Sequence, residues 1–305
     1  MDLFDDRLRV LSGNVCFDEP MKKHTTFRVG GPAKVFVTPQ TVSELASVIR
    51  LCREWKEPYF ILGNGSNLLV SDAGYRGVVI HVGRAFEQIR VEGGRLFAGA
   101  GAALAKIAAK ARDASLSGLE FASGIPGTVG GALVMNAGAY GGEMAQVVCA
   151  ASVLTKDGEE KRLDKSELQM GYRKSCILPM EYIVTEVEIA LKSGDKERIC
   201  LKMEELAERR KEKQPLEYPS AGSTFKRPEG YFAGKLIMDA GLRGFSVGGA
   251  CVSEKHCGFV VNKGGASAAD ILELCRQVRE RVLKKFGVAL ELEIRLLGEF
   301  EHPYS

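Results

Sequence analysis

The chain has 305 residues, 45% hydrophobic and 27% charged, which is the balance of a water-soluble globular protein with room for two or three domains. Its 42 basic and 39 acidic residues give a net charge of +3, too little for a surface that coats nucleic acid. No apolar run approaches the roughly 18 residues of a membrane-spanning helix, and the acidic start MDLFDDRLRV lacks the apolar stretch of a secretory signal. We therefore expect a cytoplasmic protein with no membrane span and no nucleic-acid partner.

The first segment, 1–57, is expected to contain an extended piece at 34–37 and one helix. The helix begins at Thr41, since Thr41 and Glu44 have the spacing of a capping box. Its apolar face comes from residues three or four positions apart, namely Val42, Leu45, Val48, Ile49 and Cys52.

The second segment, 58–195, is punctuated by glycines and rich in short apolar runs of the kind that form strands. The expected strands are 59–62, 78–82, 89–91, 96–98 and 184–191. In the last of them, Val187 and Ile189 alternate with glutamates, the pattern of a half-buried strand. One helix, near 104–114, interrupts the series.

A highly charged helix at 196–213 is expected to connect this segment to the last one, 214–305, which opens after Gln214-Pro215. In the last segment, an amphipathic helix over 267–286 is expected between two strands. These strands are expected at 258–262 and 289–297.

Eight cysteines are scattered along the chain, and no two have the Cys-x-x-Cys spacing. In a chain of this size, that distribution fits reduced thiols better than a disulfide framework. The adjacent His256 and Cys257 have no second pair of ligands to join them, so no metal site is expected.

The most distinctive stretch is 118–142, GLEFASGIPGTVGGALVMNAGAYGG, with eight glycines in 25 residues. Glycine has no side chain and tolerates positive φ, so such a run lets backbone N–H groups press against a ligand. The apolar residues between the glycines indicate a packed, irregular segment and argue against a disordered linker. A set of tight turns in an ordinary core is the alternative at this point.

A second loop, LGNGSNLL at 62–69, leaves one apolar run and enters another through a tight turn. Consecutive N–H groups in such a turn form a nest for an anion, and Ser66 and Asn67 add side-chain hydrogen bonds suited to a diphosphate. A hairpin turn explains the loop equally well when it is taken alone. By contrast, GAGAAL at 99–104 only imitates a dinucleotide fingerprint, because Leu104 occupies the third glycine position.

Six motifs follow one another along essentially the whole chain: TTFRVGGPA at 25–33, LGNGSNLLVSD at 62–72, GIPGTVGGALVMNAGAYGGE at 124–143, GYRKS at 171–175, KQPLEYPSAGSTFKRP at 213–228 and LELEIRLLGE at 290–299. In this order they resemble the UDP-N-acetylenolpyruvoylglucosamine reductases, the MurB family, in its shorter branch. The resemblance implies an α+β fold: an FAD-binding two-subdomain fold of the vanillyl-alcohol-oxidase (PCMH) type plus a C-terminal α/β substrate-binding domain. The subdomains would be 1–57 and 58–195, and the substrate domain 214–305.

The resemblance also implies two cofactors, non-covalent FAD and NADPH. NADPH would reduce FAD, and flavin N5 would deliver hydride to C3 of UDP-N-acetylglucosamine enolpyruvate, giving UDP-N-acetylmuramate for peptidoglycan. Because negative charge develops beside the substrate carboxylate, such a site needs cationic groups and a proton donor for C2. The implied partner is a small nucleotide sugar, and we expect the protein to be a monomer.

Three residues match the catalytic positions of that family. Ser223 matches the proton donor, and Arg173 matches the arginine that stabilises the intermediate, whose charge survives desolvation. Glu293 matches the catalytic glutamate because it directly precedes a hydrophobic-arginine pair, here Ile294-Arg295. Taken singly, the three residues also have ordinary interpretations: a turn serine, a surface arginine and the wet face of a strand.

Cofactor contacts are implied along both glycine-rich loops, by Gly63, Asn64, Gly65, Ser66, Asn67, Gly124, Ile125, Pro126, Gly127, Thr128, Gly130, Gly131, Asn136, Gly138 and Ala139. Substrate contacts are implied for Lys213, Lys226, Arg227 and His256. The last two depart from the asparagine and glutamine of some relatives.

Two other hypotheses remain open from the sequence. The chain could be a flavin oxidase or dehydrogenase of the same cofactor fold that acts on another small molecule, against which Ser223 and Glu293 argue. It could also be a non-catalytic nucleotide-sugar binding protein, which the presence of Ser223, Arg173 and Glu293 together disfavours.

Overall fold

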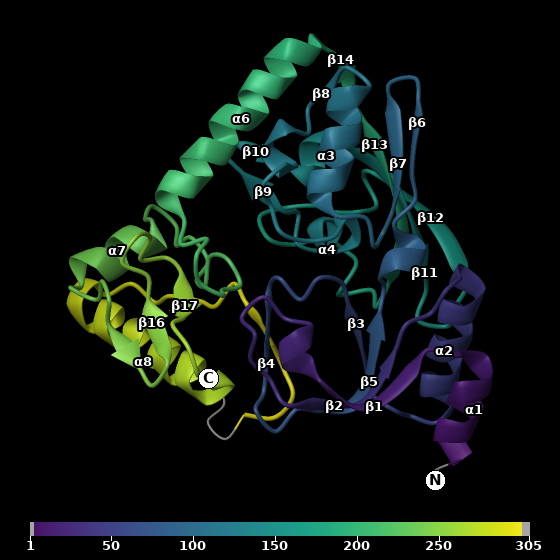
Figure 1. Ribbon diagram of the computed structural model, residues 1–305, viewed down its shortest axis with the longest axis horizontal. Helices are drawn as coiled ribbons and strands as arrows, with labels where there is room; N and C mark the ends of the chain where they lie inside the picture. The colour runs from purple at the N-terminus through teal and green to yellow at the C-terminus, as the bar shows by residue number, and fades with distance from the viewer. Residues whose placement is uncertain (1–2, 301–305) are drawn as a thin grey trace. The chain divides into compact units, whose positions relative to one another are not determined.

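Figure 1 traces residues 3–300, the part of the chain that this computed structural model describes. The chain divides into two compact units, each assembled from separate stretches of sequence. The first comprises Met1–Cys16, Val35–Asn64 and Gly77–Arg210, and the second comprises Phe17–Lys34, Gly65–Arg76 and Lys211–Ser305. Residues 1–2 of the predicted segment 1–57 and residues 301–305 of the predicted segment 214–305 lie outside the described residues. The predicted segment boundaries stay predictions.

The first unit contains a five-stranded antiparallel sheet in the order β12-β11-β13-β7-β6. Its strands are β6 (Ile89–Glu92), β7 (Arg95–Gly99), β11 (Val148–Leu154), β12 (Glu160–Asp164) and β13 (Ile183–Ala190). Three of them, β6, β7 and β13, confirm expected strands to within one residue at each end, whereas β11 and β12 were not expected. Along β13, Val187 and Ile189 are buried on one face, and on the other Glu188 forms ion pairs with Arg95 and Arg162.

Between residues 84 and 213, two helices confirm expectations and two others were not expected from the sequence. The expected ones are α3 (Leu104–Asp113) and α6 (Lys196–Lys213), the second of which ends in the other unit. The unexpected ones are α4 (Val129–Val134), inside the glycine-rich run, and α5 (Met144–Val147). Helix α4 packs against β7 and β13. Short pieces complete this part of the chain: η2 (Arg84–Phe86), η3 (Glu120–Ala122), β8 (Leu116–Ser117), β9 (Gly138–Ala139), β10 (Gly142–Glu143) and β14 (Lys192–Ser193).

A second sheet, of four strands, has the order β1-β2-β5-β3. Its strands are β1 (Val15–Pro20), β2 (Pro32–Val37), β3 (Tyr59–Leu62) and β5 (Tyr75–His81). Three helical elements lie in the same part of the chain: α1 (Leu3–Leu11) precedes β1, η1 (Met21–Lys23) follows it, and α2 (Val42–Glu54) precedes β3. Strand β3 coincides with its expected range. Helix α2 is capped as expected, since the Thr41 side chain accepts a hydrogen bond from the N–H of Glu44 at 3.1 Å. Its predicted apolar residues Leu45, Val48, Ile49 and Cys52 are buried.

The second unit combines helices with two small sheets. Its remaining elements are β4 (Leu68–Val70), α7 (Ala233–Asp239), β15 (Ser246–Val247), β16 (Ala250–Val252), β17 (Val260–Asn262), α8 (Ala268–Phe286) and β18 (Arg295–Leu297). Strands β15, β16 and β17 form an antiparallel sheet against which α8 packs, and β18 runs parallel to β4. Within residues 3–300, no helix is both long and apolar enough to cross a membrane.

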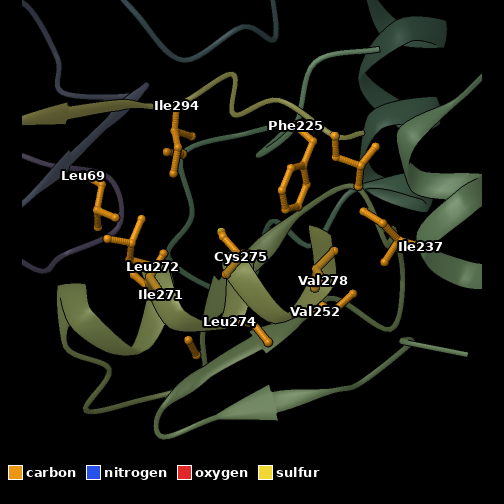
Figure 2. Close-up of a cluster of buried hydrophobic side chains, with 14 of the residues drawn as sticks. Leu69, Phe225, Ile237, Val252, Ile271, Leu272, Leu274, Cys275, Val278 and Ile294 are labelled. Atoms are coloured by element: carbon orange, nitrogen blue, oxygen red, sulfur yellow. The ribbon is translucent and has the colours of Figure 1, made fainter. Parts of the chain in front are cut away.

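Helix α8 carries the hydrophobic core of the second unit. Figure 2 shows Ile271, Leu274 and Val278 of α8 within a cluster that also holds Leu69 of β4 and Ile294. The amphipathic pattern read from the sequence is therefore confirmed, with the helix starting at Ala268 after the cap Ser267. Because Leu69 belongs to this cluster, the stretch Gly65–Arg76 is held in the second unit by burial of its own apolar side chains.

The strand expected over 289–297 is wrong in its first part. Only β18 is regular, and residues before it make one isolated bridge between Phe225 and Leu292. The alternation that suggested a strand is real, because Leu290 and Ile294 are buried in the core. The backbone there bonds to single groups: the N–H of Glu293 donates to the Thr224 carbonyl at 2.8 Å, so no continuous ladder forms. Alternation reports which side chains face the core and leaves the backbone partners undetermined.

A carboxylate distant in sequence caps the N-terminus of α8. The backbone N–H groups of Ala268 and Ala269 donate to the two side-chain oxygens of Asp72, at 2.8 and 2.9 Å. These N–H groups have no partner inside the helix, and the positive end of the helix dipole favours the negative charge. Asp72 thus joins the turn after β4 to the longest helix of the second unit.

We expect Asp72→Ala to lower the free energy of unfolding by about 1–2 kcal/mol, because it removes both hydrogen bonds and the favourable charge at the helix terminus. Urea unfolding followed by circular dichroism measures this. The control is Asp157→Ala, which removes an exposed carboxylate paired with Arg53 at 3.4 Å and should change stability by less than about 0.5 kcal/mol. Equal effects of the two substitutions would contradict the role of Asp72.

Candidate active site

In the first unit, the two glycine-rich loops meet at Gly63 and Thr128. A Cβ atom on Gly63 would lie 2.6 Å from the Thr128 hydroxyl oxygen, so only glycine fits this approach. The Thr128 hydroxyl is itself fixed, since it caps α4 by accepting a hydrogen bond from the N–H of Gly131 at 3.3 Å. The structure therefore brings together the start of the 63–67 turn and the middle of the 118–142 run.

The 118–142 run is packed, as its apolar residues predicted. Phe121, Val129 and Leu133 are buried, while Gly124 is exposed and Ile125 is half-buried. The expectation of an irregular segment needs one correction, because Val129–Val134 forms the short helix α4. Two backbone hydrogen bonds attach the first turn of α4 to residues 100–102. The N–H of Val129 donates to the Ala102 carbonyl, and the N–H of Gly130 donates to the Ala100 carbonyl.

The loop that carries Arg173 is attached to the end of the same run. The side-chain amide of Asn136 donates to the Gly171 carbonyl at 3.0 Å, and the Ser175 hydroxyl donates to the Val134 carbonyl at 2.9 Å. Asn136 is 1% exposed, and its side-chain oxygen accepts from the N–H of Ala145 at 2.8 Å. Asn136, a candidate cofactor contact, thereby ties the loop of the candidate catalytic Arg173 to the glycine-rich run.

Arg173 itself occupies a strained position in a tight turn. Its φ is 54°, in the left-handed region that costs a residue with a side chain about 1–2 kcal/mol. Its guanidinium lies 5.2 Å from the ring centre of Tyr172 and is half-buried. Strain of this kind is kept where the surrounding bonds enforce it, here those from Asn136 and Ser175.

Arg210 is a candidate site residue that the sequence reasoning missed. A Cβ atom on Gly124 would lie 3.0 Å from a terminal guanidinium nitrogen of Arg210, which places this cation against the glycine-rich run. Burial lowers the pKa of Arg210, and no carboxylate is among the groups that shift it. The preceding Arg209 lies 5.2 Å from the ring centre of Tyr140 in the same run. Arg210 sits in a helix of alternating charges, so its sequence context gave no signal that it differs from its exposed neighbours.

In the second unit, Asn67 and Glu293 are directly bonded, and Ser223 lies one residue from the same contacts. The side-chain amide of Asn67 donates to the Glu293 carbonyl at 3.1 Å, and the N–H of Glu293 donates to the Thr224 carbonyl at 2.8 Å. Thr224, next to Ser223, is fully buried, and its hydroxyl accepts from the N–H of Val260 at 2.9 Å. The backbone is therefore fixed at Thr224, the residue that directly follows Ser223.

Lys226 follows in the same segment and is paired with an exposed carboxylate. The side-chain ammonium of Lys226 lies 2.9 Å from a side-chain oxygen of Glu291. The backbone N–H of Lys226 also donates a hydrogen bond to the Glu291 carbonyl. This pair lowers the pKa of Glu291. Glu291 and Glu293 thus differ in their surroundings, because Glu291 is exposed beside a cation and Glu293 is half-buried.

His256 and Arg227 lie around the start of α7. The Nδ1 atom of His256 accepts a hydrogen bond from the N–H of Gly258 at 3.1 Å, and a Cβ on Gly234 would lie 3.3 Å from the His256 ring. The Arg227 guanidinium lies 4.0 Å from the ring centre of Phe232, which is 62% exposed. Lys213 is exposed at the end of α6, and among the described residues no hydrogen bond or ion pair joins it to this group.

Burial lowers the pKa of His256 below its ordinary value of 6.5, so the ring is neutral at pH 7. With Nδ1 accepting from Gly258, the proton of the neutral ring lies on Nε2, which makes that atom a donor. The unfolded chain regains the ordinary pKa, so below about pH 6.5 the unfolded state binds more protons than the folded state and stability falls.

We expect His256→Gln to remove the share of the acid-induced loss of folding stability that His256 causes. The loss of unfolding free energy between about pH 7.5 and about pH 5.5 should be smaller in the variant than in the original protein. Urea unfolding at the two pH values measures it. Identical losses in both proteins would show that His256 titrates normally in the folded state.

The turn that joins Asn64 to Asn67 contains one residue with positive φ, Gly65, at 57°. A Cβ atom on Gly65 would lie 2.0 Å from the His24 carbonyl oxygen, and the Gly65 carbonyl accepts from the N–H of Thr26 at 3.2 Å. The TTFRVGGPA segment therefore lies against the turn inside the second unit.

We expect Gly65→Ala to destabilise the protein by about 3 kcal/mol, because an added Cβ suffers both the positive φ and a clash with backbone. Gly93→Ala is the matched control: its φ is 60°, and a Cβ there meets nothing within 4 Å. That control should cost about 1 kcal/mol, the φ penalty alone. Equal losses in urea unfolding would show that the approach to His24 relaxes freely.

No group of three or more His, Cys, Asp or Glu side chains within residues 3–300 is arranged to hold a metal ion. The eight cysteines, all of which lie in this range, are unpaired thiols. Burial raises the pKa of Cys52 to about 12, so its thiol stays protonated and unreactive.

Comparisons with known proteins assign two stretches of the chain to family models. Residues 33–164 match the family model of an FAD binding domain, and residues 214–297 match that of the UDP-N-acetylenolpyruvoylglucosamine reductase C-terminal domain. A UDP-N-acetylenolpyruvoylglucosamine reductase of Agathobacter rectalis is 57% identical over 295 residues, covering 93% of this chain and 94% of that protein. One of Clostridium botulinum is 55% identical over 288 residues, 94% of each.

Solved structures agree. The crystal structure of UDP-N-acetylenolpyruvylglucosamine reductase (MurB) from Thermus caldophilus has a TM-score of 0.80 and 42% identity, covering 93% of this chain and 98% of that one. Phl p 4.0202, a glucose dehydrogenase, has a TM-score of 0.51 and 15% identity over 64% of this chain and 45% of its own. The second likeness is one of fold alone.

Proposed function

The chain belongs to the UDP-N-acetylenolpyruvoylglucosamine reductase family, and from this membership we propose that it reduces UDP-N-acetylglucosamine enolpyruvate to UDP-N-acetylmuramate with NADPH. Its fold is α+β, with an FAD-binding domain and the C-terminal domain of that family, and it is an FAD-dependent oxidoreductase. The product would serve peptidoglycan synthesis. The hydrogen bond from Asn67 to Glu293 is the observation that supports this reaction most directly. It joins a candidate cofactor residue to a candidate catalytic one, and Glu293 in turn bonds to Thr224, the residue after Ser223.

FAD would be held by the 63–67 turn and by residues 124–139. The fit is supported by the close approaches at Gly63 and Gly65, which leave backbone in place of side chains, and by the apolar Ile125 and Val129 of the run. When bound, FAD supplies hydride transfer, accepting hydride from NADPH and passing it from N5 to C3 of the enolpyruvyl group. The other proposed contacts are those along the same two loops, from Gly63 to Asn67 and from Gly124 to Ala139.

Ser223 would give the proton to C2 of the substrate. A serine hydroxyl is a weak acid, so it can act only on a strongly basic carbanion, which hydride addition to C3 creates. Its position is supported by the buried Thr224, whose N–H donates to the Gly258 carbonyl at 2.9 Å. A donor held in this way loses little freedom when it acts.

Arg173 and Glu293 would stabilise the charge that develops on the substrate. An arginine remains positive in a dry site, and a preorganised charge is worth more there than in water. The half-buried side chain and enforced turn of Arg173 support this role. Glu293 would orient or polarise the enolate, and Lys226 would assist through its ammonium.

Lys213, Arg227 and His256 would contact the nucleotide sugar. Lys213 supplies a positive charge for the diphosphate, and Arg227 a guanidinium beside the exposed ring of Phe232. His256 would act as a neutral donor through Nε2, as its hydrogen bond from Gly258 supports. Arg210, whose half-buried guanidinium lies beside Gly124, is a further group for an anionic substrate or cofactor.

The visible spectrum of the purified protein tests this function. NADPH should bleach the flavin absorbance, and UDP-N-acetylglucosamine enolpyruvate should restore it under anaerobic conditions. A protein that remains colourless after addition of FAD would refute the assignment. Flavin that reoxidises with oxygen but never with the enolpyruvyl substrate would point instead to an oxidase or dehydrogenase of the same fold.

We expect Ser223→Ala to leave bleaching by NADPH unchanged and to slow reoxidation by the substrate at least about 100-fold, the usual worth of a general acid. Stopped-flow absorbance separates the two half-reactions. Ser220→Ala, in the same Ser-Ala-Gly-Ser turn, is the matched control and should reoxidise at the original rate. Unchanged reoxidation in Ser223→Ala would remove the proton-donor role.

A further inference from the structure

Asn136 is a buried polar residue whose side chain has two partners inside the first unit. Its amide nitrogen donates to the Gly171 carbonyl at 3.0 Å, and its amide oxygen accepts from the N–H of Ala145 at 2.8 Å. The first partner can only accept and the second can only donate, so the orientation of the amide is fixed. Asn136 is 1% exposed, which leaves its side chain out of reach of a ligand.

The Gly171 carbonyl also closes the turn that carries Arg173. The N–H of Lys174 donates to this carbonyl at 3.1 Å, and the N–H of Gly171 donates to the Lys174 carbonyl at 3.0 Å. A carbonyl oxygen has two lone pairs, so it can accept from Lys174 and Asn136 together. Asn136 therefore bonds to the same group that joins the two ends of the turn, with Tyr172 and Arg173 between them.

The C-terminal end of α4 supports this contact. The N–H of Asn136 donates to the Leu133 carbonyl at 3.2 Å, and its φ of 40° lies in the left-handed region, which asparagine tolerates better than most residues. The same helix end holds the residue after Lys174, because the Ser175 hydroxyl donates to the Val134 carbonyl at 2.9 Å. The turn of Arg173 is thus bonded to the end of α4 on both of its sides.

We propose that Asn136 is a positioning residue, which holds the 171–174 turn so that the Arg173 guanidinium stays where it stabilises charge on the substrate. Arg173 has a strained φ of 54°, so the turn should relax once a bond that enforces it is removed. Displacing a catalytic group by about 1 Å can cost about 100-fold in rate. The proposal rests on the proposed function, in which Arg173 acts on the substrate, and it gives the Asn136 side chain a role other than contact with FAD.

The test is Asn136→Gly, which removes both side-chain hydrogen bonds and accepts the positive φ without strain. Reoxidation of the reduced flavin by the enolpyruvyl substrate should slow about 10- to 100-fold. The affinity for FAD should stay within about 3-fold, because the side chain does not touch the cofactor. Stopped-flow absorbance measures the first quantity, and titration of protein stripped of FAD measures the second. An affinity that falls about 10-fold or more would show a cofactor contact and overturn the proposal.

A double-mutant cycle with Arg173 separates positioning from a general loss of structure. In Arg173→Ala no guanidinium is left to be positioned, so adding Asn136→Gly should slow reoxidation by less than about 2-fold further. A merely structural Asn136 would slow reoxidation by the same factor with and without Arg173. That additive result would overturn the proposal.

Thr155→Val is the matched control, because it also removes a side chain that makes two hydrogen bonds to backbone. The Thr155 hydroxyl accepts from the N–H groups of Asp157 and Glu159, each at 3.2 Å, in the turn between β11 and β12. This variant should melt at a lower temperature than the original protein and reoxidise within about 2-fold of the original rate. Equal slowing in Thr155→Val and Asn136→Gly would contradict a specific role for Asn136.

Hydrogen exchange of the FAD-bound protein gives a readout that does not depend on activity. In Asn136→Gly, the N–H groups of Gly171 and Lys174, which close the turn, should exchange at least about 10-fold faster than in the original protein. In Thr155→Val they should exchange at the original rate. Unchanged exchange at Gly171 and Lys174 in Asn136→Gly would overturn the proposal.

The proposed function can fail separately. If the original protein never reduces the enolpyruvyl substrate, the reaction assignment is wrong, and the catalytic role of Asn136 fails with it. If the original protein reduces the substrate and Asn136→Gly does so at the same rate, only the role of Asn136 is overturned.

Discussion

The constraint on which the candidate site depends is the absence of a Cβ atom at Gly63 and Gly65. Gly63 approaches the hydroxyl of Thr128, and Gly65 approaches the carbonyl of His24, at separations that no side chain permits. Two residues further on, Asn67 binds the carbonyl of Glu293. Five consecutive residues thus make one close contact with each of three segments that the sequence had singled out separately. Each contact lies within one compact unit, and the chain itself passes from one unit to the other between Asn64 and Gly65.

This constraint also explains why the cofactor loops contain so few charged residues. Backbone N–H groups can approach a diphosphate only where side chains are missing, and they supply fixed dipoles without the desolvation penalty of buried charges. Where side chains do occur beside these loops, they already serve the fold. Asn136 bonds to Gly171 and Ala145, and Thr128 caps α4.

The sequence predicted those elements whose signal is local. Helices α2 and α8 have caps and an apolar stripe, and β3 is a short apolar run between turn residues, so each could be read without knowing its partners. Strand β12 could not, because only Leu163 of its five residues is buried and its strand conformation comes from pairing with β11. The strand expected at 289–297 failed for a related reason: its side chains alternate, but its first residues bond to Thr224 and Asn67 and have no neighbouring strand.

The residues of the candidate site likewise divide into those with a local sequence signal and those defined by long-range contacts. Ser223 and Glu293 could be proposed from motifs, but their link through Thr224 and Asn67 depends on a long-range arrangement that one sequence does not reveal. Arg210 looks like its exposed neighbours in a charged helix. Its partial burial and its approach to Gly124 set it apart, and only the folded chain defines them.

Burial also decides which basic side chains of the chain keep a positive charge at neutral pH. It lowers the pKa values of Arg210, Arg295 and His256 alike. Arginine begins so far above neutrality that both guanidiniums keep their charge, whereas histidine begins at 6.5 and becomes neutral. The same desolvation therefore leaves two permanent positive charges and one uncharged donor.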